Sequence, residues 1–180
     1  MSGFGTFFRG HPGRVGAAFA AVAAFSFIGW YLGSPLFVRS YRNDPLPLAS
    51  ADSSASAAQT TAPTTATAAP TARVIASGEL GFVDPIHNGK GPVRVVAVGD
   101  QRFVRFEDVM LTNAPDVHVY LSRETGGNWS EGTSLYLGPL KATNGSFNYE
   151  LPAGADPAGF RSVVVWCRAF RVLITWADLT

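Results

Sequence analysis

The chain carries one cysteine, Cys167, at the end of the apolar run RSVVVWC (161–167). A single thiol cannot form a disulfide within the chain, so three roles stay open: a small core residue, a redox or ligand thiol, or half of an intermolecular bridge. The residue type favours a packed thiol, because free cysteine is among the most buried residues. Arg168 and Arg171 could instead stabilise a thiolate if their guanidinium groups reach the sulfur. A redox function would therefore depend on where Cys167 lies.

A second group of reactive side chains lies in the run DVHVYLS (116–122). Strand alternation places three residues on each face: Val117, Val119 and Leu121 on one, and Asp116, His118 and Tyr120 on the other. The apolar face is expected to join a core. A histidine beside an acid and a phenol could form a proton-linked or ligand site, but a polar face turned to solvent is the more common arrangement.

The sequence does not favour a metal site or identify a cofactor. A blue-copper site needs a histidine, and usually a methionine, within a few residues after its cysteine. Residues 168–173 contain neither, and His87, Met110 and His118 all lie far upstream of Cys167. Zinc would need paired ligand spacings, which one cysteine and two scattered histidines in this region do not supply. We therefore expect no metal and identify no cofactor.

The elements that must position these residues form an all-β domain over 73–180. About eight short runs rich in β-branched and aromatic residues recur there, separated by turn-forming residues: GELGFV, VRVVAV, RFVRFE, VHVYLS, SLYLG, SFNYEL, SVVVWC and FRVLITW. No stretch of this region has the pattern of an amphipathic helix. The spacing predicts an antiparallel β-sandwich or a Greek-key barrel of about eight strands.

Residues 15–38 contain no charged side chain, and as a helix they would reach about 36 Å, enough to cross the hydrocarbon core of a bilayer. We therefore expect a single transmembrane helix after a cytoplasmic tail at 1–14. The alternative is a cleaved signal peptide, but signal-peptide hydrophobic regions are shorter than this run. Gly29 and Gly33 form a GxxxG pair, which predicts at most a weak homodimer through the helix.

A linker is expected over 39–72, because residues 49–72 are almost entirely Ala, Ser, Thr and Pro with one charge. Such a segment cannot bury enough surface to offset its ordering entropy, so it is expected to be disordered. The charges flanking the helix are nearly balanced, and a long polar stalk suits a domain held off the outer face of a membrane. We therefore expect a single-pass membrane protein with a cytoplasmic amino terminus and an extracytoplasmic β domain.

Several functional classes have no support in the sequence. The net charge is +1, and no basic stripe interleaved with aromatic residues is present, so nucleic acid is not an expected partner. The chain has no glycine-rich phosphate loop, no nucleophile elbow and no haem-attachment pair of cysteines. No enzymatic activity is assigned on these grounds.

The order of four segments resembles the DM-thirteen domain, a small β-rich family to which electron transfer is ascribed and which often occurs beside DOMON domains and membrane cytochromes. These segments are GDQRFVRFEDVML, APDVHVYLS, LYLGPLKATNGSFNYELPAGAD and RSVVVWCRAFRVLITWADL. They cover about the last hundred residues, and the helix and linker lie outside them. One departure is Ala114, where the family more often has glycine before its proline-aspartate strand.

The resemblance implies that Cys167 occupies the position of a cysteine proposed to be redox-active. It also implies that Asp116, Val117, Val119, Tyr120 and Leu121 belong to the family's proline-aspartate strand. Because the chain contains no DOMON or cytochrome segment, any electron partner must be a separate redox protein. Two hypotheses follow: a membrane-anchored electron-transfer domain acting through the Cys167 thiol, and a non-catalytic extracytoplasmic binding module in which that thiol is structural.

Overall fold

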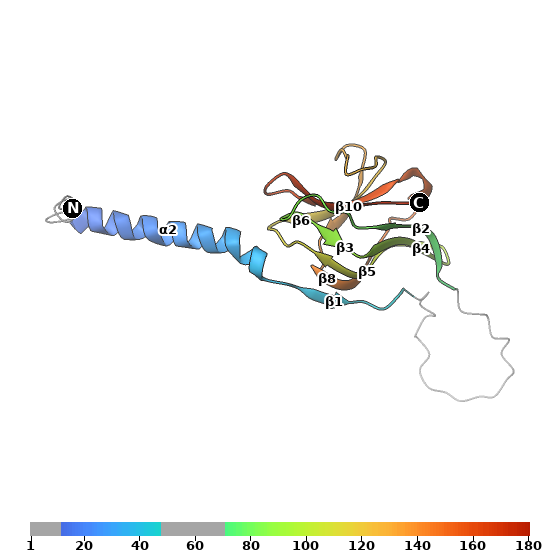
Figure 1. The fold of residues 1–180 in the computed structure, drawn as a ribbon, viewed down its shortest axis with the longest axis horizontal. Helices are drawn as coiled ribbons and strands as arrows, with labels where there is room; N and C mark the ends of the chain where they lie inside the picture. The colour runs from blue at the N-terminus through green and yellow to red at the C-terminus, as the bar shows by residue number, and fades with distance from the viewer. Residues whose placement is uncertain (1–11, 48–70) are drawn as a thin grey trace, which may run out of the picture. The chain divides into compact units, whose positions relative to one another are not determined.

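The structure is a computed structural model that describes residues 12–47 and 71–180 (Figure 1). The chain divides into two units, Met1–Val38 and Arg39–Thr180. The predicted tail at 1–14 lies almost entirely outside the described residues, and so does the part of the predicted linker at 48–70.

Helix α2 spans Pro12–Phe37, which confirms the helix expected at 15–38. Proline is suited to the first turn of a helix because the amide hydrogen it lacks would have no intrahelical acceptor there. Among the residues that the structure describes, no helix is long and apolar enough to cross a membrane. The membrane-spanning part of our prediction therefore finds no support here. The cellular location and the homodimer through Gly29 and Gly33 stay predictions.

The second unit contains two β-sheets. The six-stranded sheet has β1 (Tyr41–Asn43), β8 (Asn144–Glu150), β5 (Gln101–Leu111), β4 (Pro92–Val98) and β2 (Arg73–Glu79) in that order, with β3 (Gly89–Lys90) also paired to β5. The four-stranded sheet has β10 (Val172–Asp178), β9 (Ser162–Cys167), β6 (Val117–Ser122) and β7 (Leu135–Pro139) in that order. A short 3₁₀ helix, η1, spans Pro157–Gly159. The all-β prediction is confirmed, and the sheets do not close into a barrel.

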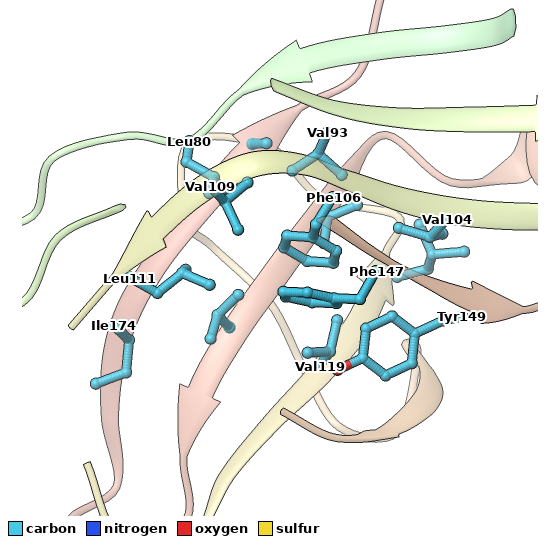
Figure 2. Close-up of a cluster of buried hydrophobic side chains, with 14 of the residues drawn as sticks. Leu80, Val93, Val104, Phe106, Val109, Leu111, Val119, Phe147, Tyr149 and Ile174 are labelled. Atoms are coloured by element: carbon cyan, nitrogen blue, oxygen red, sulfur yellow. The ribbon is translucent and has the colours of Figure 1, made fainter. Parts of the chain in front are cut away.

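The main hydrophobic core lies between the two sheets, as in a β-sandwich. Figure 2 shows its centre, where the ring of Phe106 on β5 stacks on that of Phe147 on β8 with centroids 4.9 Å apart. The facing sheet contributes Val119 of β6, which is fully buried. As alternation predicted, Val117 and Leu121 point into the same core.

The first strand of the domain begins earlier than expected. The run GELGFV was predicted to be a strand, but β2 ends at Glu79, and Phe82 makes only an isolated bridge with Asn88. At Gly81, the amide bonds the Trp176 carbonyl at 2.7 Å, so this part of the chain passes to the other sheet rather than continuing β2.

The predicted linker at 39–72 was expected to have no regular structure, but its first part contains β1, which pairs with β8 as a parallel edge strand. The Ser40 carbonyl accepts from the Asn144 amide at 3.0 Å, and the Asp44 amide donates to the Ser146 carbonyl at 2.7 Å. These hydrogen bonds are made by backbone groups of β8, and the amino-acid composition of 39–47 does not predict them. Gly145 lies inside β8, where a Cβ would collide with the Arg42 carbonyl.

Candidate functional site

Cys167 lies on the core-facing side of β9. Its side chain has 0% exposure and packs in the main core together with Val163 and Val165. The thiol donates to the Pro115 carbonyl oxygen at 2.9 Å. A soluble reagent therefore cannot reach the sulfur unless β9 or its neighbours move.

The opposite face of the four-stranded sheet carries a group of aromatic and charged residues that we call the outer cluster. Its members are Asp116, His118, Tyr120, Trp129, Glu131, Tyr136, Trp166 and Arg168, which hydrogen bonds and ring contacts connect. The cluster and Cys167 lie on different sides of one sheet.

Strand pairing brings the outer cluster together. On the outer face, His118 of β6 pairs with Trp166 of β9, and Tyr120 pairs with Tyr136 of β7. The loop at 123–134 then covers these strands. Its Trp129 ring lies 4.5 Å from that of Tyr120, between centroids.

This covering loop corrects the expectation that the polar face of 116–122 turns to solvent. His118 is only 8% exposed and Tyr120 only 1%. The loop packs closely against the sheet, because a Cβ on Gly127 would lie 2.8 Å from Leu173 Cδ2. Polar side chains buried in this way need hydrogen-bond partners, and both of these residues have them.

Asp116, His118 and Tyr136 form a hydrogen-bonded chain. The Asp116 carboxylate lies 2.6 Å from Nε2 of His118, and the Tyr136 hydroxyl lies 2.8 Å from Nδ1. An ionised carboxylate only accepts hydrogen bonds, so Nε2 carries a proton. In the neutral imidazole, Nδ1 is then the acceptor for the Tyr136 hydroxyl. His118 is thus placed as a base for that phenol.

The backbone supports this arrangement. Asp116 has a φ of 60°, in the left-handed region that non-glycine residues seldom adopt. Its carbonyl accepts from the Arg168 amide at 3.0 Å, which links the start of β6 to the end of β9. Strain of this kind persists where surrounding contacts hold it, and it is concentrated at functional sites.

Tyr120 and Arg168 form the second polar pair of the cluster. Nε of Arg168 donates to the Tyr120 hydroxyl at 2.7 Å, and the guanidinium also forms an ion pair with Glu131 at 3.2 Å. Burial raises the pKa of Tyr120 above its ordinary value, with the Arg168 hydrogen bond opposing the shift. Tyr120 therefore stays protonated at neutral pH.

The position of Arg168 shows whether its guanidinium can reach the Cys167 sulfur. Its guanidinium carbon lies 4.7 Å from the centre of the Tyr136 ring, a cation–π contact on the outer face. The Cys167 thiol lies on the core side. The suggestion that Arg168 could stabilise a Cys167 thiolate is therefore wrong for this conformation, and Arg168 belongs to the aromatic site instead.

Four aromatic rings of the cluster form an unbroken series of contacts. The Tyr136 ring lies 5.2 Å from that of Tyr120, the Tyr120 ring 4.5 Å from that of Trp129, and the Trp129 ring 5.1 Å from that of Trp166, measured between centroids. All three separations fall in the range of direct aromatic contact. Tyr136, at one end, is 43% exposed. Tyr120 is the most buried ring of the series, and Trp129 and Trp166 beyond it are partly exposed.

A small pocket of about 250 Å³ adjoins the hydrogen-bonded chain. Asp116 and His118 line one part of it. The other lining residues come from the segment before β1 and from the ends of β6 and β7: Ser40, Asn113, Ala114, Val117, Pro139, Leu140 and Thr143. The pocket gives the His118–Asp116 pair a route to water. In the part of the chain that is described, no group of three His, Cys, Asp or Glu residues could hold a metal ion.

Residues 81–179 match a protein-family model described as Electron transfer DM13. The match covers more than half of the 180 residues. The chain belongs to this family. No curated protein and no solved structure gives a significant match.

The DM13 match confirms the resemblance drawn from the four segments, and it contains both Cys167 and the whole outer cluster. Sequence reasoning singled out Cys167 and His118 but missed the roles of Tyr136, Trp129 and Trp166. Those residues come from a loop and from two other strands, and only strand register brings them together. The only feature of the sequence that could have pointed to these three residues is that all of them are aromatic.

Proposed function

We propose that this DM13 protein exchanges single electrons with a separate redox protein through the outer cluster. The observation that supports the proposal is the series of ring contacts from Tyr136 to Trp166. Electron-transfer rates fall steeply with distance, so rings in contact pass an electron far more readily than isolated rings. Tyrosine and tryptophan are also among the most easily oxidised side chains.

The exposed end of the series suits contact with a partner. Tyr136 is an exposed aromatic residue with a charged neighbour, Arg168, whose guanidinium also pairs with Glu131. Aromatic residues and arginine are enriched at protein interfaces. A partner docked over Tyr136 would place its redox centre close to the first ring. The extracytoplasmic location and the membrane anchor stay predictions of the sequence.

A redox role for the Cys167 thiol, which the family resemblance implies, remains a separate proposal. It would require β9 to open, because the sulfur is fully buried and hydrogen-bonded to Pro115. No described contact joins the thiol to the outer cluster. We therefore place the exchange of electrons at the cluster rather than at the cysteine.

The experiment compares two tyrosines in the full 180-residue chain. Photogenerated tris(bipyridine)ruthenium(III) serves as a one-electron oxidant, and its rate of reduction by the protein is followed by absorbance. Tyr136→Phe should slow this reaction several-fold, whereas Tyr41→Phe should have a small effect although Tyr41 is more exposed, at 72% against 43%. If the Tyr41 substitution has the larger effect, exposure alone governs the reaction and the proposal is wrong.

A second comparison tests whether the rings act together. Trp129→Leu interrupts the contacts between Tyr120 and Trp166 without touching the Tyr136 hydroxyl. In a Trp30→Phe background, which removes a tryptophan that is 74% exposed and open to direct oxidation, Trp129→Leu should prevent an oxidising equivalent from passing beyond Tyr120, so the tryptophan radical seen after the flash should be lost. An unchanged tryptophan radical signal in this variant would contradict transfer through Trp129.

A further inference from the structure

We propose that Tyr136 is the redox residue of the cluster and that it is oxidised with transfer of its proton to Nδ1 of His118, which Asp116 positions. This inference rests on the proposed function and specifies the chemistry of the same site. It is carried by the hydrogen-bonded chain, the charge of Arg168 and the pocket beside His118.

The first argument comes from hydrogen-bond direction. In the neutral imidazole, the Asp116 carboxylate holds the proton on Nε2, and Nδ1 is the acceptor 2.8 Å from the Tyr136 hydroxyl. A general base must lie within hydrogen-bond distance of the proton it accepts, and this separation meets that condition before any movement. The carboxylate then stabilises the imidazolium that forms.

The second argument comes from charge. Removing an electron from a phenol without removing its proton leaves a cation on the ring. The guanidinium carbon of Arg168 lies 4.7 Å from the Tyr136 ring centre, so such a cation would be repelled. Loss of the proton to His118 keeps the oxidised side chain neutral. Electrostatics therefore favour proton-coupled oxidation at Tyr136.

The third argument distinguishes Tyr136 from Tyr120. The Tyr120 hydroxyl accepts from Nε of Arg168, and its own proton points toward Glu131 at the longer distance of 3.4 Å. Its ring is 1% exposed. Tyr136 combines a short hydrogen bond to the His118 imidazole with access to solvent. It is thus the better primary donor, and Tyr120 is the next ring inward.

The step balances as follows. An oxidised metal centre of the partner takes one electron from Tyr136, the phenolic O–H bond breaks, and the proton forms an N–H bond at Nδ1 of His118. The products are a neutral tyrosyl radical, an imidazolium paired with Asp116, and the metal centre reduced by one electron. Return of an electron from a donor restores the phenol as the proton moves back from His118.

The pocket gives the proton an exchange route. His118 and Asp116 both line the cavity of about 250 Å³, and among the described residues that line it Asp116 is the only Asp, Glu, Lys or Arg. The titratable and charged groups that face His118 are Asp116 and Tyr136 directly and Arg168 across the Tyr136 ring. Protonated His118 cannot accept from Tyr136. Proton transfer from Tyr136 therefore requires the neutral imidazole.

The test uses the full chain and the same ruthenium(III) oxidant, with His118→Gln as the main variant. Glutamine can accept a hydrogen bond but is not a base at neutral pH. A positioned base contributes about 100-fold or more to a proton-transfer step, so we expect a loss of roughly that size in the rate of tyrosyl radical formation. The unsubstituted protein should react more slowly in D₂O, and the variant should lose this isotope effect.

Asp116→Asn provides a second variant that does not depend on the folding of His118→Gln, because the Asp116 side chain is half exposed. It removes the charge that stabilises the imidazolium, so the rate should fall by a smaller factor than in His118→Gln. Tyr41→Phe serves as the matched control. Unchanged rates and isotope effects in both variants, with Tyr136→Phe still slow, would overturn proton transfer to His118 while leaving the proposed function standing. Loss of the Tyr136→Phe effect would instead overturn the proposed function.

Discussion

Alkylation of Cys167 provides a direct measure of whether its thiol is available for chemistry. Because this is the only thiol in the chain, iodoacetamide labelling reports on one site without substitution. The side chain has 0% exposure and packs in the main core. We therefore expect labelling only when the β domain opens.

The expected protection follows from the position of β9 in its sheet. It pairs with β10 along one edge and with β6 along the other, so exposing the sulfur requires the centre of the four-stranded sheet to separate. The cost should approach the free energy of unfolding, about 5–15 kcal/mol for a natural domain. Since about 1.4 kcal/mol corresponds to a factor of ten, labelling in buffer should be at least roughly 1,000-fold slower than in concentrated urea.

The assay is mass spectrometry of the full chain at timed intervals in buffer and in urea, with Cys167→Ser to measure alkylation of other residues. Labelling in buffer within about tenfold of the rate in urea would refute the reasoning. That result would show that β9 opens easily, and it would restore the thiol as the leading redox group.

Two further predictions concern the framework around the site. Gly145→Ala should detach β1 from β8, because Gly145 has a φ of +102° and the added methyl group would collide with the Arg42 carbonyl. We expect faster amide hydrogen exchange at 41–43 and a free energy of unfolding lowered by about 1–3 kcal/mol. Gly99→Ala is the control, because its φ is also positive but no atom lies within 4 Å of the added methyl; equal exchange at β1 in both variants would contradict the argument. Burial raises the pKa of Tyr149 above its ordinary value of 10.0, so the folded state holds this proton more tightly than the unfolded chain. The free energy of unfolding, measured in urea, should therefore keep its full value below pH 10 and decrease above it. In Tyr149→Phe this decrease should be smaller. An equal decrease in both proteins would contradict the argument.

The strands that could be predicted from the sequence are those that depend on local patterns, namely alternating apolar residues and the turn-forming residues between them. Alternation in 116–122 placed Val119 in the core, and turn-forming residues separated the two runs that form the hairpin of β4 and β5. The sequence missed β1, because a three-residue edge strand depends on an acceptor strand about a hundred residues away.

The candidate site was only partly predictable for a related reason. Asp116, His118 and Tyr120 share a face by local alternation, and that much was found. Whether the face is wet or covered depends on how the loop at 123–134 folds back, and this loop has no periodic pattern. Trp129 reaches Tyr120 through that loop, and Tyr136 reaches His118 through a strand register with a bulge. Neither contact can be predicted from a short stretch of sequence, because each joins residues from separate segments.

The two redox proposals occupy opposite faces of β9 and require different conformations. Exposing Cys167 breaks the pairing of β9 with β6 that aligns Trp166 with His118 and connects Arg168 to Asp116. A domain that worked by opening at the thiol would thus disassemble the outer cluster each time. Cys167→Val and Tyr136→Phe separate the cases: electron exchange through the cluster predicts that the valine variant keeps the rate of ruthenium(III) reduction and that the phenylalanine variant lowers it. The reverse pattern would move the function to the thiol.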